Sequence, residues 1–238
     1  MRTSKLKGTK IGCAKICTRV FLLPLAVIFF FSCSRPAPAP RTLIIEEKDV
    51  INIPEFGDKY CDYVKALEEG QTDIDYQDFR FSFLESEQFE IALKQSAKLD
   101  SLTDVMYLNM DLSNYEEIIW TTKQMLSIDY TDMLAHKFLG QTYKIVGDTI
   151  NAQKYKDIQY RLLFSIVTNG DGKSCQTAWP VIQISEEYFI LQMLDAKLKS
   201  QSVWGDKGGL CDKMDVIVHG EDQTYYFEIK KVFEKYPK

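Results

Sequence analysis

A short polar loop near residue 170 is the part of the sequence whose residue types could support chemistry. It reads Gly170-Asp-Gly-Lys-Ser174 and holds a carboxylate, an amine and a hydroxyl within five residues. Two interpretations are open. The loop could be a tight turn, since glycines supply positive φ and aspartate bonds nearby amides, and loops of this composition are usually turns. It could also line a site with the first residues of a following helix, and the candidate binding residues are then Asp171, Lys173, Ser174, Glu187 and Tyr188.

Known catalytic and metal-binding motifs fail against this sequence. A P-loop requires glycine at position 167, where Val167 stands. A nucleophile elbow requires glycine at position 176, which is Gln176, and an EF-hand loop requires a carboxylate where Ala178 stands. The two histidines, His136 and His219, are too few for a three-histidine zinc site. We therefore predict no catalytic residue, no metal and no cofactor, and we favour a protein that is not an enzyme.

The amino-terminal residues 1–32 have the composition of an export signal. Residues 1–19 carry all six basic residues of this segment and no acidic residue, and residues 20–31 are apolar. Twelve apolar residues are too few to span a bilayer but fit the core of a signal peptide. Ser32-Cys33 then resembles the cleavage motif of bacterial lipoproteins, which implies that Cys33 is the lipid attachment site and carries palmitate-type chains. A soluble secreted protein is the alternative, but residues 30–32 supply only one of the two small residues that its cleavage requires.

Residues 33–49 are expected to tether the folded part to a membrane. Pro and Ala alternate after Cys33, which is typical of an extended polyproline-II spacer. In the lipoprotein family, serine at position 34 implies sorting to the outer membrane, facing the periplasm. Beyond residue 32 the chain has 23 basic and 34 acidic residues, a net charge of −11. Such a chain repels phosphate backbones, so we predict no nucleic-acid partner.

Three cysteines remain for the folded part, Cys61, Cys175 and Cys211. An odd number cannot form a complete disulfide framework. A Cys175–Cys211 pair is permitted in an oxidising periplasm, but its spacing does not indicate one. A buried free thiol is the default expectation for each.

Residues 50–168 are predicted to be helical. Residues 55–70 have helical periodicity, residues 72–83 are expected to form an irregular connection, and residues 85–167 are nearly free of Pro and Gly. Leu139-Gly140-Gln-Thr-Tyr143, with Ala152 nine residues later, resembles the core of a tetratricopeptide repeat. That resemblance implies antiparallel helical hairpins that approach closely at Gly140 and Ala152. One and a half degenerate repeats are fewer than the three that a freestanding stack usually needs, so another element must cover it.

Residues 169–238 are predicted to form that cover. Residues 177–184 are a strand candidate, Ser185 is expected to cap a helix, and another strand is expected near 200–204. The buried face of this helix is expected to consist of Tyr188, Leu191, Leu194 and Leu198. Alternation over 214–218 and 225–229 predicts a β-hairpin. The fold class is therefore α+β, with tetratricopeptide-like hairpins followed by a small antiparallel sheet and one helix.

Five short motifs occur in a fixed order along the chain. They are Asp75-Tyr-Gln-Asp-Phe-Arg80, Gly170-Asp-Gly-Lys-Ser174 with Thr177-Ala178, Glu186-Glu-Tyr188, Asp212-Lys-Met-Asp-Val216 and Tyr225-Tyr-Phe-Glu-Ile229. Together they resemble the domain-of-unknown-function family numbered 4919, from about residue 50 onward. The resemblance implies an architecture but no reaction.

The expected function is that of an uncharacterised, membrane-tethered periplasmic lipoprotein that holds a protein or peptide partner as a binding or scaffold module. Two alternatives stay open: a hydrolase of envelope material with a site near residues 170–188, and a structural accessory subunit of an envelope complex.

Overall fold

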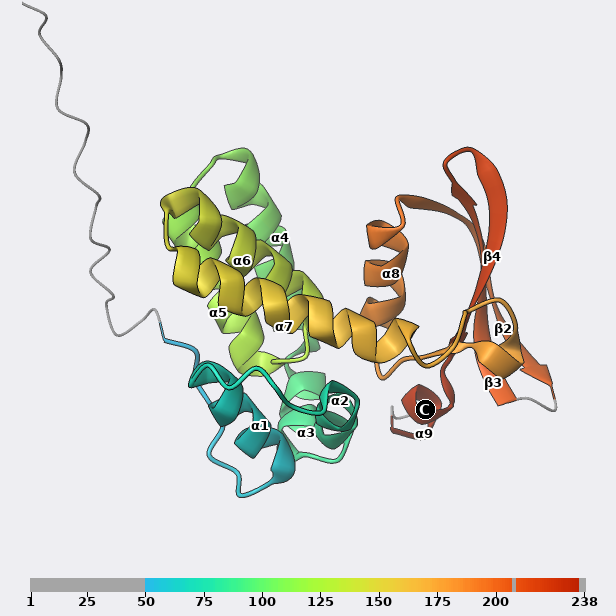
Figure 1. Ribbon diagram of the computed structural model, residues 1–238, viewed down its shortest axis with the longest axis horizontal. Coiled ribbons are helices and arrows are strands. Elements are labelled where there is room, and N and C mark those ends of the chain that lie inside the picture. Colours follow the sequence, from blue (N-terminus) through green and yellow to red (C-terminus); the bar gives the residue numbers. More distant parts are fainter. Residues whose placement is uncertain (1–49, 207–208, 236–238) are drawn as a thin grey trace, which may run out of the picture. The chain divides into compact units, whose positions relative to one another are not determined.

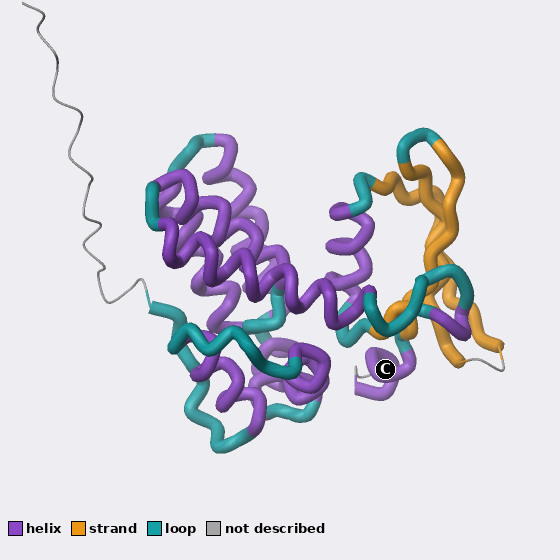
Figure 2. The backbone as a smooth tube through the Cα atoms, in the orientation of Figure 1, coloured by secondary structure: helices purple, strands orange, loops and turns teal. Residues whose placement is uncertain are grey.

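The structure, a computed structural model, describes residues 50–206 and 209–235. The expected leader, the lipid site Cys33 and the tether fall outside these residues. The described chain begins with seven helices: α1 (Lys59–Glu68), α2 (Tyr76–Leu84), α3 (Glu87–Lys94), α4 (Ser96–Asp111), α5 (Tyr115–Ile128), α6 (Met133–Val146) and α7 (Thr149–Val167). It continues with β1 (Trp179–Pro180), α8 (Ile184–Met193), β2 (Ala196–Asp206), β3 (Gly209–Val218), β4 (Glu221–Glu228) and α9 (Lys230–Lys235). In this part of the chain seven helices precede the first strand. The structure combines helices with a sheet (Figure 2), so the predicted α+β class is confirmed.

The long helices α4 to α7 pack on one another in chain order. The ends of α6 are set by its flanking residues: the Asp132 carboxylate accepts from the backbone N–H of Leu134 at 2.8 Å, and Gly147 ends the helix at φ +90°. Helices α6 and α7 approach so closely at Gly140 that a Cβ there would lie 3.1 Å from the backbone nitrogen of Lys156. The close approach of two helices that was expected at Gly140 is therefore present, while the likeness to tetratricopeptide repeats stays a prediction.

The expectation of an irregular connection over residues 72–83 is wrong, because most of this segment forms α2. Asp75 caps the helix by accepting a hydrogen bond from the backbone N–H of Asp78 at 2.9 Å. Phe79 and Phe83 are four residues apart, lie on one side of the helix and are fully buried. Further aromatic residues, Tyr76 and Phe81, lie elsewhere in the segment, so its helical periodicity could not be recognised from the sequence. The helix matters because it also positions Arg80.

The sheet has the strand order β1-β4-β3-β2. The predicted hairpin is present as β3 and β4, in which Met214 pairs with Tyr225. The sheet is mixed rather than antiparallel throughout, because β1 runs parallel to β4. The strand expected over residues 177–184 is limited to two residues, since Pro180 has no N–H to donate to a ladder.

Helix α8 packs on α6 on one side and on β2 on the other (Figure 1). It begins earlier than expected, with Gln183 rather than Ser185 at the cap position. Its predicted buried face is partly wrong: Leu191 is buried, but Tyr188 is exposed and Leu198 belongs to β2. The helix instead buries its two glutamates, which no amphipathic pattern would place in a core.

Cys175 and Cys211 form a disulfide, and Cys61 is a buried free thiol. The default expectation was therefore wrong for the first two residues and correct for Cys61. Sequence spacing carried no signal because the two cysteines are 36 residues apart. The fold places their Cα atoms 5.8 Å apart, joining the 3-10 turn Cys175–Thr177 to β3.

No helix within residues 50–206 and 209–235 has the length and apolar character needed to cross a bilayer.

Candidate functional site

A fully buried arginine, Arg80, connects α2 to the carboxy-terminal elements. Arg80 donates from Nε to Glu186 Oε1 at 2.7 Å and from Nη2 to Glu186 Oε2 at 2.6 Å. Two parallel charge-assisted bonds of this kind give both strength and a fixed geometry. Nη2 also donates to the backbone oxygen of Pro180 at 3.0 Å. One guanidinium thus joins α2 to α8 and β1.

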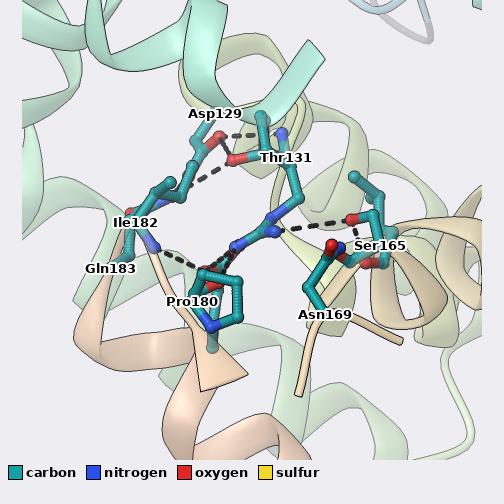
Figure 3. Close-up of polar contacts among 10 residues, drawn as sticks. Asp129, Thr131, Ser165, Asn169, Pro180, Ile182 and Gln183 are labelled. Atoms are coloured by element: carbon teal, nitrogen blue, oxygen red, sulfur yellow. Dashed lines mark hydrogen bonds and ion pairs between the residues drawn. The ribbon is translucent and has the colours of Figure 1, made fainter. Parts of the chain in front are cut away.

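Glu186 is satisfied on all sides, as a buried carboxylate must be. Its Oε2 also accepts from the backbone N–H of Ile182 at 2.8 Å, just before α8. The adjacent Gln183 donates from Nε2 to Asp129 Oδ2 at 2.7 Å, in the turn that joins α5 to α6. Figure 3 shows Asp129, Thr131 and Gln183 beside this network. The start of α8 is therefore tied to the helical region at two points.

The next residue, Glu187, forms a different kind of pair. Its side chain is fully buried and faces Asp212 in β3, which is 3 % exposed. No N–H or O–H group of the described residues donates to either oxygen of Glu187 or to Asp212 Oδ1. Two adjacent buried carboxyls cannot both be ionised. Burial, followed by the charges of Asp212 and Glu186, raises the pKa of Glu187 to about 9. A proton on Glu187 is therefore the donor that this pair of carboxyls otherwise lacks.

A chain of hydrogen bonds leads from this pair to the surface. Asp212 Oδ2 accepts from Gln201 Nε2 at 2.5 Å, and Gln201 Oε1 accepts from the Tyr188 hydroxyl at 2.8 Å. Tyr188 is 46 % exposed. These hydrogen bonds hold α8 against β2 and β3. A general acid must reach its substrate, and Glu187 has no exposed surface, so this arrangement is suited to holding α8 in place rather than to catalysis.

The polar loop near residue 170 forms the tight turn that was the simpler interpretation. Asp171 Oδ1 accepts from the Lys173 backbone N–H at 2.9 Å and from the Thr177 hydroxyl at 2.5 Å, which lowers the pKa of Asp171. Gly172 has φ +66° and lies against the ring of Trp179. Ser174 lies 2.9 Å from the Thr177 hydroxyl. The carboxylate organises the turn.

The predicted site residues fall into two groups with separate partners. The loop packs on β4, where the Tyr226 backbone N–H donates to Gly172 O at 2.9 Å and the Lys173 amine lies 4.4 Å from the ring centre of Tyr225. Glu187 and Tyr188 instead bond to residues of β3 and β2. Within the described ranges, no three His, Cys, Asp or Glu side chains gather as metal ligands.

Sequence reasoning missed the partners that complete this arrangement, namely Arg80, Gln201 and Asp212. A signal for two of them was available. Arg80 ends one of the ordered motifs and Asp212 begins another, and the structure brings both to the glutamates of the Glu186-Glu-Tyr188 motif. Motifs far apart in the chain that share no periodicity are expected to meet in space.

The fold and these contacts define an α+β protein in which buried polar residues hold one helix between a helical region and a sheet. The chain belongs to the family described as domain of unknown function DUF4919, whose profile matches residues 60–238. No curated protein and no solved structure matches it.

Proposed function

We propose that this protein is an exported lipoprotein, anchored through Cys33 to the outer membrane on its periplasmic side, that binds a partner protein there. The observation that carries the proposal is a row of exposed apolar side chains on α4 and on the residue that caps its carboxyl end. Val105, Leu108 and Leu112 are 36 %, 58 % and 67 % exposed, and we call them the apolar ridge. Their spacing of three and four residues places them on one side of the helix. Contiguous apolar surface of this kind is typical of protein docking sites.

The disulfide supports the proposed location. Disulfides form and persist in oxidising compartments and are rare in the cytosol. The Cys175–Cys211 bond therefore agrees with the export signal over residues 1–32 and with the lipoprotein-like Ser32-Cys33.

Two observations argue against a hydrolase with a site near residues 170–188. Glu187 has no exposed surface, and the Asp171 carboxylate is held by Lys173 and Thr177 within its own turn. Both acidic groups therefore have structural contacts, and the proposed binding role does not depend on either of them.

A matched pair of surface substitutions tests the binding role. Leu108 in α4 and Phe164 in α7 are each 58 % exposed. Each is replaced by Asp, and detergent-solubilised membranes are resolved by native electrophoresis. We expect Leu108→Asp to shift the protein from a complex to its monomer size, while Phe164→Asp leaves the complex intact. Equal migration of both variants with the wild type contradicts the proposal.

A further inference from the structure

Helix α4 carries a second row of side chains beside the apolar ridge. Asp100, Asp104 and Asp111 are all exposed, and we call them the acidic ridge. Within the described part of the chain, no hydrogen bond or ion pair engages their carboxylates. Lys98 is the one basic residue in α4. The exposed side of this helix is therefore strongly acidic.

The two ridges are adjacent along the whole second half of α4. Asp104 and Leu108 are four residues apart, and Leu108 and Asp111 are three apart, so each pair lies side by side on the helix surface. The residues that face the core, Leu102 and Met106, are buried on another side. The helix thus presents an apolar strip and a parallel negative strip to the same partner.

On the basis of the proposed function, we infer that the docking segment of the partner is an amphipathic helix with Lys or Arg residues beside its apolar face. The apolar ridge offers side chains at the spacing that packs against the ridges of another helix. The three carboxylates favour positive charge beside the apolar face of the partner, because like charges across an interface cost several kcal/mol.

The acidic ridge also argues against two other occupants. A second copy of α4 would bring three carboxylates toward three carboxylates, with one lysine from each helix to compensate. An anionic membrane surface attracts basic rather than acidic segments. Charge therefore favours a basic helix over both a second copy of α4 and an anionic membrane.

The test uses the full-length acylated protein in detergent micelles and a synthetic helical probe. The probe has about 18 residues, or five turns, with Leu along one face and Arg beside it. A control peptide has Glu in place of each Arg. We expect fluorescence anisotropy to detect binding of the basic probe only. Equal binding of both peptides, or binding of neither, overturns the inference.

Charge-reversal variants sharpen this test. Asp104→Lys/Asp111→Lys should weaken binding of the basic probe at least tenfold and transfer the preference to the acidic peptide. The matched control Glu85→Lys/Glu221→Lys reverses two exposed charges elsewhere and should leave binding unchanged. All four positions are exposed, and circular dichroism confirms that each variant is folded. Unchanged affinity in the α4 variant overturns the inference.

The result separates this inference from the function on which it rests. If Leu108→Asp dissolves the native complex while Asp104→Lys/Asp111→Lys does not, α4 is the docking surface but its partner is not basic. Sedimentation that shows self-association through Leu108 would identify a second copy instead. A spin label at Leu108→Cys that enters the lipid of phosphatidylglycerol vesicles would identify a membrane. Either outcome overturns the basic helix.

Discussion

The carboxyl groups of Glu187 and Asp212 face each other between α8 and β3, where burial and the neighbouring Asp212 raise the pKa of Glu187. Asp212 also accepts from Gln201, which in turn accepts from Tyr188. The adjacent Glu186 instead forms an ion pair with Arg80. Two consecutive buried glutamates therefore have different partners: Glu186 faces the helical region, and Glu187 faces the sheet.

The Glu187 carboxyl predicts a stability that falls as pH rises. Its pKa is ordinarily 4.5 and is about 9 in the folded protein. Between these values the folded protein keeps a proton that the unfolded chain has released. The free energy of unfolding therefore falls across this range, by at most ~1.4 kcal/mol per pH unit, and levels off above it. Urea unfolding of the wild type and of Glu187→Gln should give free energies that diverge with rising pH, the wild type becoming the less stable protein.

The amide of Glu187→Gln can still donate to Asp212 but cannot ionise, so the difference between the two proteins isolates this group. Glu85→Gln replaces an exposed glutamate and should run parallel to the wild type. His136 acts in the opposite direction, because burial lowers its pKa to about 4 and stability is lost as pH falls below 6.5. His136 is present in both proteins and cancels. Parallel curves for Glu187→Gln and the wild type would show that the pair holds no proton.

The Arg80–Glu186 pair predicts a large loss of stability when one partner is removed. Arg80→Met leaves the Glu186 carboxylate buried without its cation, which typically costs about 3–5 kcal/mol. The exposed pair Lys199–Asp222 provides the control: its side chains are 46 % and 75 % exposed, so Lys199→Met should cost about 1 kcal/mol or less. Urea unfolding measures both. Comparable losses in the two variants would mean that Arg80 is not buried as described.

The disulfide predicts a redox-dependent stability. Cross-linking residues 36 apart is worth about 3–4 kcal/mol by the loop-entropy relation. Dithiothreitol should therefore lower the unfolding midpoint of the wild type. The variant Cys175→Ala/Cys211→Ala should already be at that lower midpoint and should not respond to the reductant. A response of this variant, or none in the wild type, contradicts the bond.

The proposed lipid anchor at Cys33 predicts the fractionation behaviour of one variant. Cys33→Ala should leave the membrane fraction and should no longer incorporate labelled palmitate, because the variant lacks the thiol proposed to be acylated. Cys61→Ala, which removes a buried thiol elsewhere, should remain bound and labelled. A Cys33→Ala protein that stays with the membrane would refute the anchor.

Local sequence signals were sufficient for much of the fold. Alternation in β3 and β4 predicted their pairing, and the near absence of Pro and Gly over residues 85–167 predicted the helices there. Local signals failed where aromatic residues cover more than one side of a helix, as in α2. They also failed at α8, where the buried glutamates reverse the usual pattern of burial.

The polar contacts could not be predicted because each depends on distant residues. Glu186 and Glu187 stand in the first turn of α8, where acidic residues commonly stabilise the helix dipole. Their actual partners lie 106 residues away at Arg80 and in the following hairpin at Asp212. Likewise, no spacing rule indicated that Cys175 would meet Cys211. These contacts follow from the packing of α2 and the sheet around α8.

The most direct test of binding through α4 is photo-cross-linking in living cells. A photoreactive amino acid is placed at Leu108 and, as the control, at the equally exposed Phe164. We predict a discrete adduct at position 108 that is absent at position 164 and is lost when Asp104→Lys/Asp111→Lys is added. The same adducts at both positions, or none at position 108, would contradict the proposed function.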